Sequence, residues 1–521
     1  MNNWNDGYVF DIAYTFGYYP GMNPARLPLA FAYQGLQAPQ IKTACELGFG
    51  QGLSTNLHAA GSDVQWWGND FNPAQASFAQ ELAAASGSGA QMDATAFNEF
   101  CSRSDLPDFD FIALHGIWSW VSADNRDIIF DFIQRKLKPG GVLYISYNTQ
   151  PGWAALMPLR DLLVQHTAQA ANDAAGMPTE QRIDAALEFA AALFDTDPVY
   201  AQANPHMRDR LKILQQQGRN YLAHEYFNRD WHPESFAQMH QRLSSAGLEF
   251  ACPAHFADQL DMANLTPAQR QFIQGVADPV MRQSVRDFMV NQQFRRDYWV
   301  RGAQRMDGPQ RMQALALQAV VLLTDPAQVP LTLQNAASEI TLNRQVYEPI
   351  MQAMSDHRPH MLAQLADSLA ASKLTPVQIV DSVMMLIATG HVAPMAPALA
   401  QPQTSAEDLQ KTWDRTRALN LHLLQKASRD GDVGHLCSPL SGGGVAADRI
   451  QQLFLLARHE TGEAVESWPP FVWQHISAQG KKLVRDGQRL ESEQENLEEL
   501  LVQARQFAQG RLQILLALEV V

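Results

Sequence analysis

The sequence has few cysteines and few basic residues. Four cysteines among 521 residues, at positions 45, 101, 252 and 437, are too few and too far apart for a disulfide framework or a short-spaced zinc site. Lysine and arginine number 39 against 54 aspartate and glutamate residues, which gives a net charge of −15. Nucleic acid is therefore not expected as the main partner, because phosphate binding needs a basic field.

Long apolar runs are also missing. No basic residue precedes Arg26 and no apolar run follows Met1, so a secretory signal is not expected. The apolar residues 512–521 have about half the length that a membrane span needs. No metal site is expected either, because Asn228 stands where a metallopeptidase would need a second histidine after His224. With so few cysteines, the simplest expectation is a protein of the reducing cytoplasm.

The chain is too long for one hydrophobic core, and its pattern changes along its length. Residues 41–147 alternate short apolar runs with helix-like stretches, which predicts a parallel sheet with helices on both faces. The clearest strands are expected at 43–47, 63–69, 109–114 and 142–146. After about residue 158 the strand signals fade, and stretches rich in Ala, Leu, Gln and Arg predict mostly helix.

The most informative segment is a glycine loop that follows the first expected strand. Gly48, Gly50 and Gly52 have the spacing Gly-x-Gly-x-Gly, which differs from the Gly-x-Gly-x-x-Gly of dinucleotide-binding proteins. Glu46 precedes them, and its carboxylate would repel a pyrophosphate. The same carboxylate suits the ammonium and sulfonium charges of S-adenosylmethionine.

Two acids follow later strands at positions that fit the same ligand. Asp70 comes directly after the second strand, where a carboxylate can accept hydrogen bonds from both ribose hydroxyls. Asp93 lies where a further strand should end and could accept one from the adenine amino group. Each feature alone is ordinary, but their order along the chain predicts an S-adenosylmethionine site.

The glycine loop, the two acids and the later turn at 137–143 resemble the class I S-adenosylmethionine-dependent methyltransferases. The resemblance implies a seven-stranded sheet with one antiparallel edge strand, and a cofactor at the carboxyl ends of the strands. Further cofactor contacts are then expected from Phe49, Phe71, Ala94 and His115.

A second resemblance covers most of the chain. Residues 18–20, 23–27, 221–225, 294–296 and 438–442, together with the ends of the fourth and fifth strands, are similar to bacterial methyltransferases that carry a methyltransferase regulatory domain. That group includes protein-lysine methyltransferases that act on an outer-membrane surface protein. The resemblance implies a protein substrate.

These features predict an α/β fold, in which a Rossmann-like seven-stranded methyltransferase domain is followed by mostly α-helical middle and C-terminal domains. The expected parts are an N-terminal lid segment (1–40), the cofactor-binding domain (41–165), a helical middle or regulatory domain (166–310), a winged-helix-like domain (311–400) and a C-terminal helical domain (401–521). A helix expected at 481–509 would pack on another domain or on a second subunit, which makes a homodimer one possible assembly.

The expected methyl-acceptor site lies where the fourth and fifth strands end, because both ends face the cofactor pocket in this fold. These segments carry the candidates His115, Trp118, Tyr147, Asn148 and Trp153. Transfer to protein lysine is the leading hypothesis. A small-molecule or natural-product methyltransferase, and a non-catalytic protein that keeps the cofactor fold as a binding module, are the alternatives.

Overall fold

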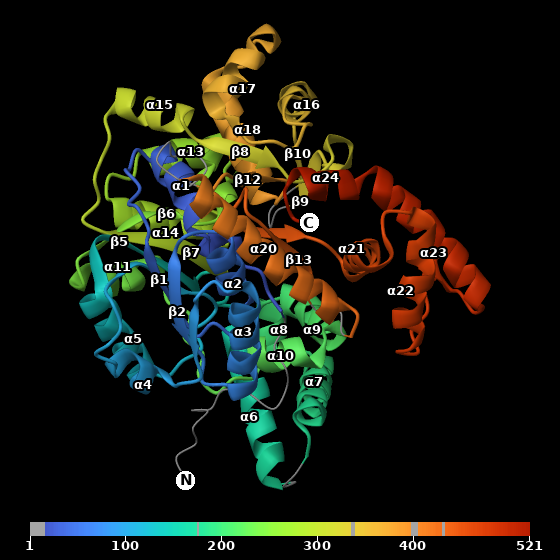
Figure 1. Ribbon diagram of the computed structural model, residues 1–521. Coiled ribbons are helices and arrows are strands. Elements are labelled where there is room, and N and C mark those ends of the chain that lie inside the picture. The colour runs from blue at the N-terminus through green and yellow to red at the C-terminus, as the bar shows by residue number, and fades with distance from the viewer. Residues whose placement is uncertain (1–15, 174–176, 335–338, 397–404, 430–432) are drawn as a thin grey trace.

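The computed structural model describes residues 16–173, 177–334, 339–396, 405–429 and 433–521. A seven-stranded sheet lies at its centre (Figure 1), with strand order β3-β2-β1-β4-β5-β7-β6. β7 runs antiparallel to both its neighbours, and β1 to β5 pair in parallel. The strands are β1 Thr43–Leu47, β2 Gln65–Asn69, β3 Gln91–Asp93, β4 Phe109–Leu114, β5 Leu137–Asn148, β6 Leu248–Pro253 and β7 Phe294–Arg301. The predicted Rossmann-like class is confirmed.

Two details of the sheet differ from the sequence-based expectation. The antiparallel strand is not the edge strand, because β7 lies between β5 and β6. The sheet also does not end at the boundary expected at residue 165, since β6 and β7 come from the region expected to be helical. β7 pairs with β5, which is distant in sequence, and β6 and β7 pair with each other. The local sequence therefore gave no signal that predicted these two strands.

Helices cover both faces of the sheet because the strands are apolar on both sides. The first face carries Ala44, Ala113 and Tyr144 and packs under α1 (Leu27–Tyr33). The second face carries the alternate residues and packs against α4, α5 and α11. These three helices are Phe97–Ser102, Ala123–Lys136 and Phe236–Ser245. The order of the strands in the sheet reverses between β1 and β4. Ligands of open α/β sheets bind at such a switch point.

Capping residues fix the helix after β2 at both ends. In α3 (Pro73–Ser86) the Asn72 side chain accepts a hydrogen bond from the N–H of Ala74, and Pro73 occupies the first turn. Gly87 ends the helix with φ of +63°. The helix therefore begins directly after the β2 loop, which holds that loop in a fixed place.

A helical bundle follows β5 and has its own core, built around Trp153 and Trp231. Its longer helices α6 and α7 project from the lower end of the molecule in Figure 1. The bundle consists of α6 Met157–Asp173, α7 Thr179–Asp195, α8 Val199–Ala203, α9 His206–Gln216 and α10 Arg219–Tyr226. The chain then returns to the sheet through α11, β6, η3 Phe256–Gln259, α12 Asp261–Asn264, α13 Pro267–Gln274, α14 Pro279–Met289 and β7.

A small three-stranded sheet, in the order β11-β8-β12, organises the next region. Three helices pack on it, and Gly390 makes the turn into β12 with φ of +79°. The winged-helix comparison stays a prediction. The elements are α15 Gly308–Ala316, β8 Ala319–Leu322, η4 Pro326–Gln328, β9 Thr332–Gln334, β10 Glu339–Thr341, α16 Arg344–Ala353, β11 His360–Met361, α17 Leu362–Ser368, η5 Ala370–Ser372, α18 Pro376–Ala388 and β12 Val392–Pro394.

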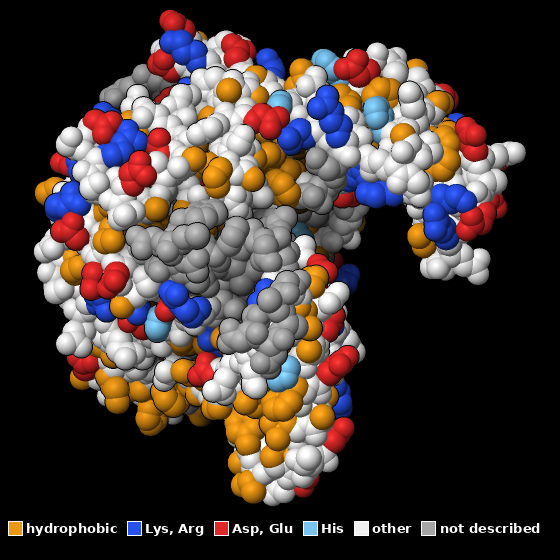
Figure 2. Space-filling model, turned by 90° about the horizontal axis from the view of Figure 1, so that it is seen from below, with side chains coloured by type: hydrophobic (Ala, Val, Ile, Leu, Met, Phe, Trp, Pro, Cys, Tyr) orange, Lys and Arg blue, Asp and Glu red, His pale blue; other side chains and the backbone are white. Residues whose placement is uncertain are grey.

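The C-terminal region packs on the helices that follow β1 and β2. Leu57 of α2 (Leu53–Ala60) and Leu82 of α3 share one core with Leu423 of α20. Helices α22 and α23 project to the right in Figure 1, and the projection stands clear of the body in Figure 2. The elements are α20 Ala406–Ala427, β13 His435–Ser438, β14 Gly443–Ala446, α21 Arg449–Thr461, η6 Val465–Ser467, α22 Trp468–Ser477, β15 Val484–Arg485, β16 Gln488–Arg489, α23 Glu493–Gln509 and α24 Arg511–Ala517.

The helix expected at 481–509 is α23, preceded by the β15–β16 hairpin, and it packs on α22 of the same chain. Whether a second subunit also contacts it stays a prediction. Among the described residues, no helix combines the length and the apolar character that crossing a membrane requires.

Candidate active site

The loop between β1 and α2 contains three glycines in the left-handed region. Their φ values are +70° at Gly48, +57° at Gly50 and +65° at Gly52, which residues with a Cβ rarely adopt. A Cβ at Gly52 would lie 2.6 Å from the Cβ of Ala79, so packing excludes a side chain there. Around the Cβ position of Gly50, no described atom lies within 4 Å. The loop therefore leaves open space beside Gly50, where a ligand can approach the backbone.

Asp70 lies directly after β2 and is buried. Its Oδ2 accepts a hydrogen bond from the N–H of Gly50 and its Oδ1 accepts one from the N–H of Asn72, both at 2.9 Å. Burial raises the pKa of Asp70 to about 6, although the two N–H groups oppose this shift. Each carboxylate oxygen keeps a second lone-pair site. The side chain can therefore accept two further hydrogen bonds, which matches the two hydroxyls of a ribose.

Glu46 is buried in the first face of the sheet at the end of β1. Its carboxyl accepts a hydrogen bond from the Thr55 hydroxyl of α2. Burial raises the pKa of Glu46 to about 8, the hydrogen bond from Thr55 lowers it, and the nearby charge of Asp70 raises it further. A cation placed beside the carboxyl would favour its ionised form. Glu46 is therefore suited to a positively charged group.

Asp93 ends β3 and is partly exposed. Its Oδ2 pairs with Arg103 at 2.6 Å, and its backbone carbonyl accepts a hydrogen bond from the N–H of Asp70. The strand ends at Asp70 and Asp93 are thus adjacent. The remaining sequence-based candidates differ in exposure: Phe49 packs in a small core with Ala76, Ala79 and Met92, Phe71 is half-buried, and Ala94 is exposed.

His115 follows β4 and contacts two tyrosines. The ring centroid of Tyr19 lies 3.7 Å from that of His115, and the His115 Nδ1 lies 2.8 Å from the Tyr144 hydroxyl. Burial, helped by the charge of Arg296, lowers the pKa of His115 to about 3, so the imidazole is neutral near pH 7. The Tyr19 N–H donates a hydrogen bond to Ser54 at the start of α2. Tyr19 therefore links α2 with the end of β4, next to the glycine loop.

The structure separates the five acceptor candidates rather than bringing them together. His115 contacts Tyr144 on the first face, and strand alternation places Asn148 on that face as well. Trp118 and Tyr147 are buried in the second-face core. The Trp118 Nε1–H donates to Glu234 at 2.5 Å.

Trp153 lies in the core of the helical bundle. Its Nε1–H donates to the carbonyl of Gln293 at 2.7 Å, and its ring meets that of Trp231 edge-on. Direct contact with a methyl acceptor stays a prediction for each of the five candidates.

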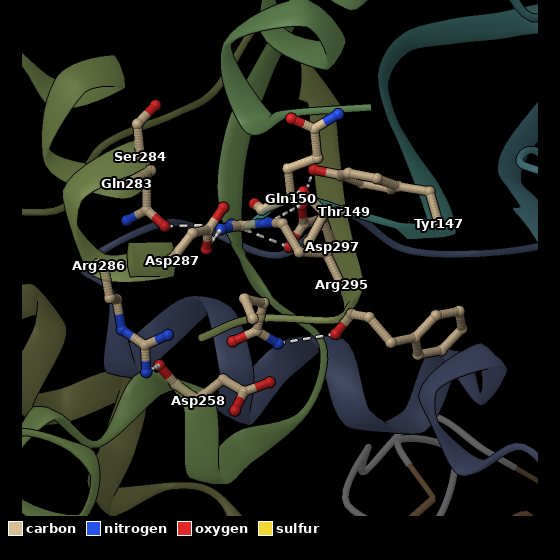
Figure 3. A network of polar contacts seen from close by, with 12 residues as sticks. Tyr147, Thr149, Gln150, Asp258, Gln283, Ser284, Arg286, Asp287, Arg295 and Asp297 are labelled. Atoms are coloured by element: carbon tan, nitrogen blue, oxygen red, sulfur yellow. Dashed lines mark hydrogen bonds and ion pairs between the residues drawn. The ribbon is translucent and has the colours of Figure 1, made fainter. Parts of the chain in front are cut away.

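Tyr147 belongs to a network of polar contacts (Figure 3). Its hydroxyl donates to Asp297 at 2.9 Å. Arg295 pairs with Asp287 at 2.5 Å and with Asp297 at 2.9 Å, and the three side chains are at most 4% exposed. Arg295 also donates to Gln283 of α14 at 3.1 Å. The network joins β5, β7 and α14 beneath the second face.

Comparison with known proteins assigns two regions of the chain to described families. Residues 45–145 match a family described as methyltransferase domain, and residues 218–301 match one described as predicted methyltransferase regulatory domain. An uncharacterized protein of Synechocystis, sll1526, is 37% identical over 98% of each chain. The chain belongs to the class I S-adenosylmethionine-dependent methyltransferases that carry a methyltransferase regulatory domain.

Two solved structures agree with this methyltransferase in fold, and a further relative is similar in sequence. PKMT2 from Rickettsia typhi superposes with a TM-score of 0.66 at 15% identity, over 96% of this chain and 99% of PKMT2. Its complex with AdoHcy gives a TM-score of 0.68 at 17% identity, over 97% of this chain and all of PKMT2. The uncharacterized protein RP789 of Rickettsia prowazekii is 26% identical over 55% of this chain and 51% of its own length.

S-adenosylmethionine is the cofactor of this methyltransferase, and the residues at the β1 and β2 ends fit it. The open space at Gly50 admits a ligand against the loop. Asp70 would hold the ribose hydroxyls, Glu46 would face a cationic group, and Asp93 would lie toward the base. When bound, the cofactor supplies an electrophilic methyl group next to a sulfonium charge. The assignment of individual residues remains a prediction.

Several residues around the site were not found from the sequence. Tyr19, Tyr144 and Arg296 surround His115, but they come from the N-terminal segment, from β5 and from β7. The similarity of residues 18–20 and 294–296 to the family was a signal for two of them. No sequence signal indicated that Tyr144 lies beside His115. Residues on both faces of β5 are buried, so the sequence pattern does not show which of them point toward the site.

Proposed function

We propose that this methyltransferase transfers methyl groups to the side-chain amines of lysine residues in proteins. The support is the extent of the fold likeness to PKMT2, a protein lysine methyltransferase, which reaches beyond the sheet to 97% of this chain. The helical bundle, the small sheet and the C-terminal region are all included. A protein substrate needs a large contact surface, which these additions could supply.

A groove beside the expected acceptor segment could receive part of a protein substrate. It has a volume of about 440 Å³ and is open to solvent. Its walls come from the segment after β5, from α9 and from the turn before β7, and include Pro151, Gly152, Leu156, His206, Arg210 and Asn291. Trp153 and Gln293, which are hydrogen-bonded to each other, adjoin it. An extended peptide segment could lie there with one side chain directed toward the end of β5.

The chemistry requires a neutral amine. A lysine with a pKa near 10.4 has its neutral form disfavoured at pH 7 by about 4.6 kcal/mol. Burial against aromatic rings, next to a sulfonium, lowers that pKa through desolvation and like-charge repulsion. His115 is neutral near pH 7, so it carries no charge that would shift the protonation of the amine. Water can accept the proton before transfer, and the protein then contributes by orienting the amine.

The reaction is assigned to the cytoplasm as part of this proposal. All four cysteines are buried as free thiols, which suits a reducing compartment. The methyl acceptor then meets the enzyme before any export.

The test is methyl transfer from radiolabelled S-adenosylmethionine to an extract of cells that lack this enzyme. We expect label in protein, recovered as methyl-lysine after hydrolysis, and less labelling with the Asp70→Ala variant at S-adenosylmethionine concentrations that do not saturate the wild type. Label in the low-molecular-mass fraction would support a small-molecule methyltransferase instead. Absence of transfer, with cofactor binding intact, would support a non-catalytic binding protein.

A further inference from the structure

The cofactor presents a group for which the residues named so far provide no partner. Its amino-acid tail ends in a carboxylate as well as an ammonium. Glu46, Asp70 and Asp93 are all acids, which suit cations and hydroxyl donors and repel a carboxylate. A bound carboxylate needs N–H donors, best of all a guanidinium.

Two guanidinium groups associated with the first face lack a carboxylate partner among the described residues. Arg26 is 7% exposed; its side chain hydrogen-bonds with Tyr298, but its Nε has no hydrogen-bond partner. Its guanidinium lies over the ring of Phe256, 4.3 Å from the centroid. Arg296 is half-buried, and its Nε is likewise buried without a partner. A charge held away from water without a counter-charge is unfavourable, so the pair points to an anion that binds there.

The strand register places Arg296 at the cofactor end of the sheet. Arg296 pairs with Ser146 of β5, and the Ser146 Oγ accepts a hydrogen bond from the N–H of Gly116, the residue after His115. Asn148 is two residues further along β5, on the same face. It is 4% exposed, and its Nδ2 has no hydrogen-bond partner. Burial, with the charge of Arg296 as a further cause, lowers the pKa of Arg26, so the two guanidinium groups lie near each other. Donors from three parts of the chain therefore gather around one end of the first face.

A nearby acid offsets the charge of this cluster only in part. Asp258, in η3, pairs with His255 at 3.6 Å; the charge of Arg296 helps to lower the pKa of Asp258, but no direct ion pair joins these two groups among the described residues. Tyr298 and Tyr144, also on this face, carry hydroxyls and no charge. Arg26 and Arg296 thus lie among aromatic rings, and neither forms an ion pair with Asp258 or Glu46 among the described residues, so both guanidinium groups keep donors for a carboxylate.

We propose that Arg296, together with Arg26 and Asn148, forms a carboxylate-binding subsite, and that its occupant is the carboxylate of the cofactor's amino-acid tail. Guanidinium and amide N–H groups would donate hydrogen bonds to the carboxylate oxygens. The subsite concerns the cofactor, so its test is independent of the methyl acceptor proposed above.

The test compares ligands that differ only in the tail. AdoHcy, its decarboxylated analogue and 5′-methylthioadenosine share the adenosine and the thioether sulfur, but only AdoHcy has the carboxylate. Calorimetric titration of the full-length protein is expected to show about 10- to 100-fold tighter binding of AdoHcy than of the decarboxylated analogue, the range for hydrogen bonds to a charged group. Arg296→Met should reduce this preference at least about tenfold, and Arg296→Lys should keep part of it.

Arg301→Met is the matched control. Arg301 is a half-buried arginine of the same strand, and it donates to backbone carbonyls of Ile133, Gln134 and Leu137 on the opposite face. It should leave the ligand preference unchanged. Circular dichroism of each variant verifies folding, and a milder change, Arg296→Gln, replaces Arg296→Met if the latter is unfolded.

A second arm distinguishes the source of the carboxylate. Acetate is titrated into the AdoHcy complex of the wild-type and Arg296→Met proteins. If the tail fills the subsite, acetate does not bind. Acetate binding that depends on Arg296, with an unchanged AdoHcy preference, would keep the subsite but assign its carboxylate to the methyl acceptor. An unchanged preference without Arg296-dependent acetate binding would overturn the subsite.

Discussion

Two neighbouring arginines of β7 occupy opposite surroundings. Arg295 faces the second side of the sheet and is enclosed by Asp287, Asp297 and Gln283. Arg296 faces the first side and has no carboxylate partner among the described residues. We call the Arg295 group, including Tyr147, the closed network. The open cluster comprises Glu46, Asp70, Asn148 and Arg296, the polar side chains at the cofactor end of the first face.

The difference separates stability from binding. In the closed network each charged group already has a protein partner, so removing one leaves another unpaired. In the open cluster the groups keep free lone pairs or free N–H donors, which a ligand can use. Substitutions in the closed network should therefore change the free energy of unfolding, and those in the open cluster should change affinity.

The largest effect is expected from breaking the closed network. Arg295→Met leaves two buried carboxylates without their counter-charge and should lower the free energy of unfolding by about 3–5 kcal/mol. Denaturant unfolding monitored by circular dichroism measures this change. Arg344→Met, which removes an exposed pair with Glu348, serves as control and should cost less than about 1 kcal/mol. Equal effects of the two substitutions would contradict the importance of the closed network.

Asp70→Ala should have the next largest effect, and it should be on binding. Loss of hydrogen bonds to a charged carboxylate, worth about 1.5–3 kcal/mol each, should weaken AdoHcy binding at least about tenfold. Calorimetric titration above pH 7 is the measurement, since Asp70, with a pKa of about 6, is ionised there. An affinity equal to wild type would remove Asp70 from the cofactor site.

Glu46 should give a smaller effect that depends on pH. Its pKa of about 8 in the free protein means that the carboxyl is mostly protonated at pH 7. A bound cation favours the ionised form, so binding should release a proton, and affinity should rise with pH until about pH 8 and then level off. Titrations in buffers with different ionisation enthalpies count the protons. The Glu46→Gln variant reports the protons that the ligand's own amine releases, so the difference between the two proteins is the contribution of Glu46. Equal proton release from both proteins would refute the assignment.

The smallest effect is expected for Arg296→Met on stability. The substitution removes no ion pair and no hydrogen bond that the described residues provide, so the free energy of unfolding should change by less than about 1 kcal/mol. The same unfolding experiment as for Arg295→Met gives a direct contrast between adjacent positions. A loss as large as that of Arg295→Met would show that Arg296 also belongs to a structural network.

The cofactor half of the sheet could be predicted from the sequence because its signals are local. Gly48 to Gly52 and Asp70 lie in short segments that directly follow strands, and the ligand chemistry limits which residues fit. The fold class followed from the same segments.

The other half depends on pairing across long separations. β7 joins β5 from about 150 residues away, and its sequence, Phe294–Arg301, carries charges on both faces. It therefore shows neither an apolar run nor an alternation typical of a strand. The burial of Tyr147 and Trp118 in the second-face core could not be predicted either. The sequence indicated that both residues lie near strand ends at the cofactor side, but not which face of the sheet each side chain occupies.

The placement of β6 and β7 has a consequence for how this enzyme can be divided. Seven residue pairs join β5 to β7, so a fragment ending near residue 165 would expose a long, apolar strand edge that invites self-association. The segment named for regulation thus finishes the catalytic scaffold. We therefore expect that neither portion folds independently, and that either portion expressed alone aggregates.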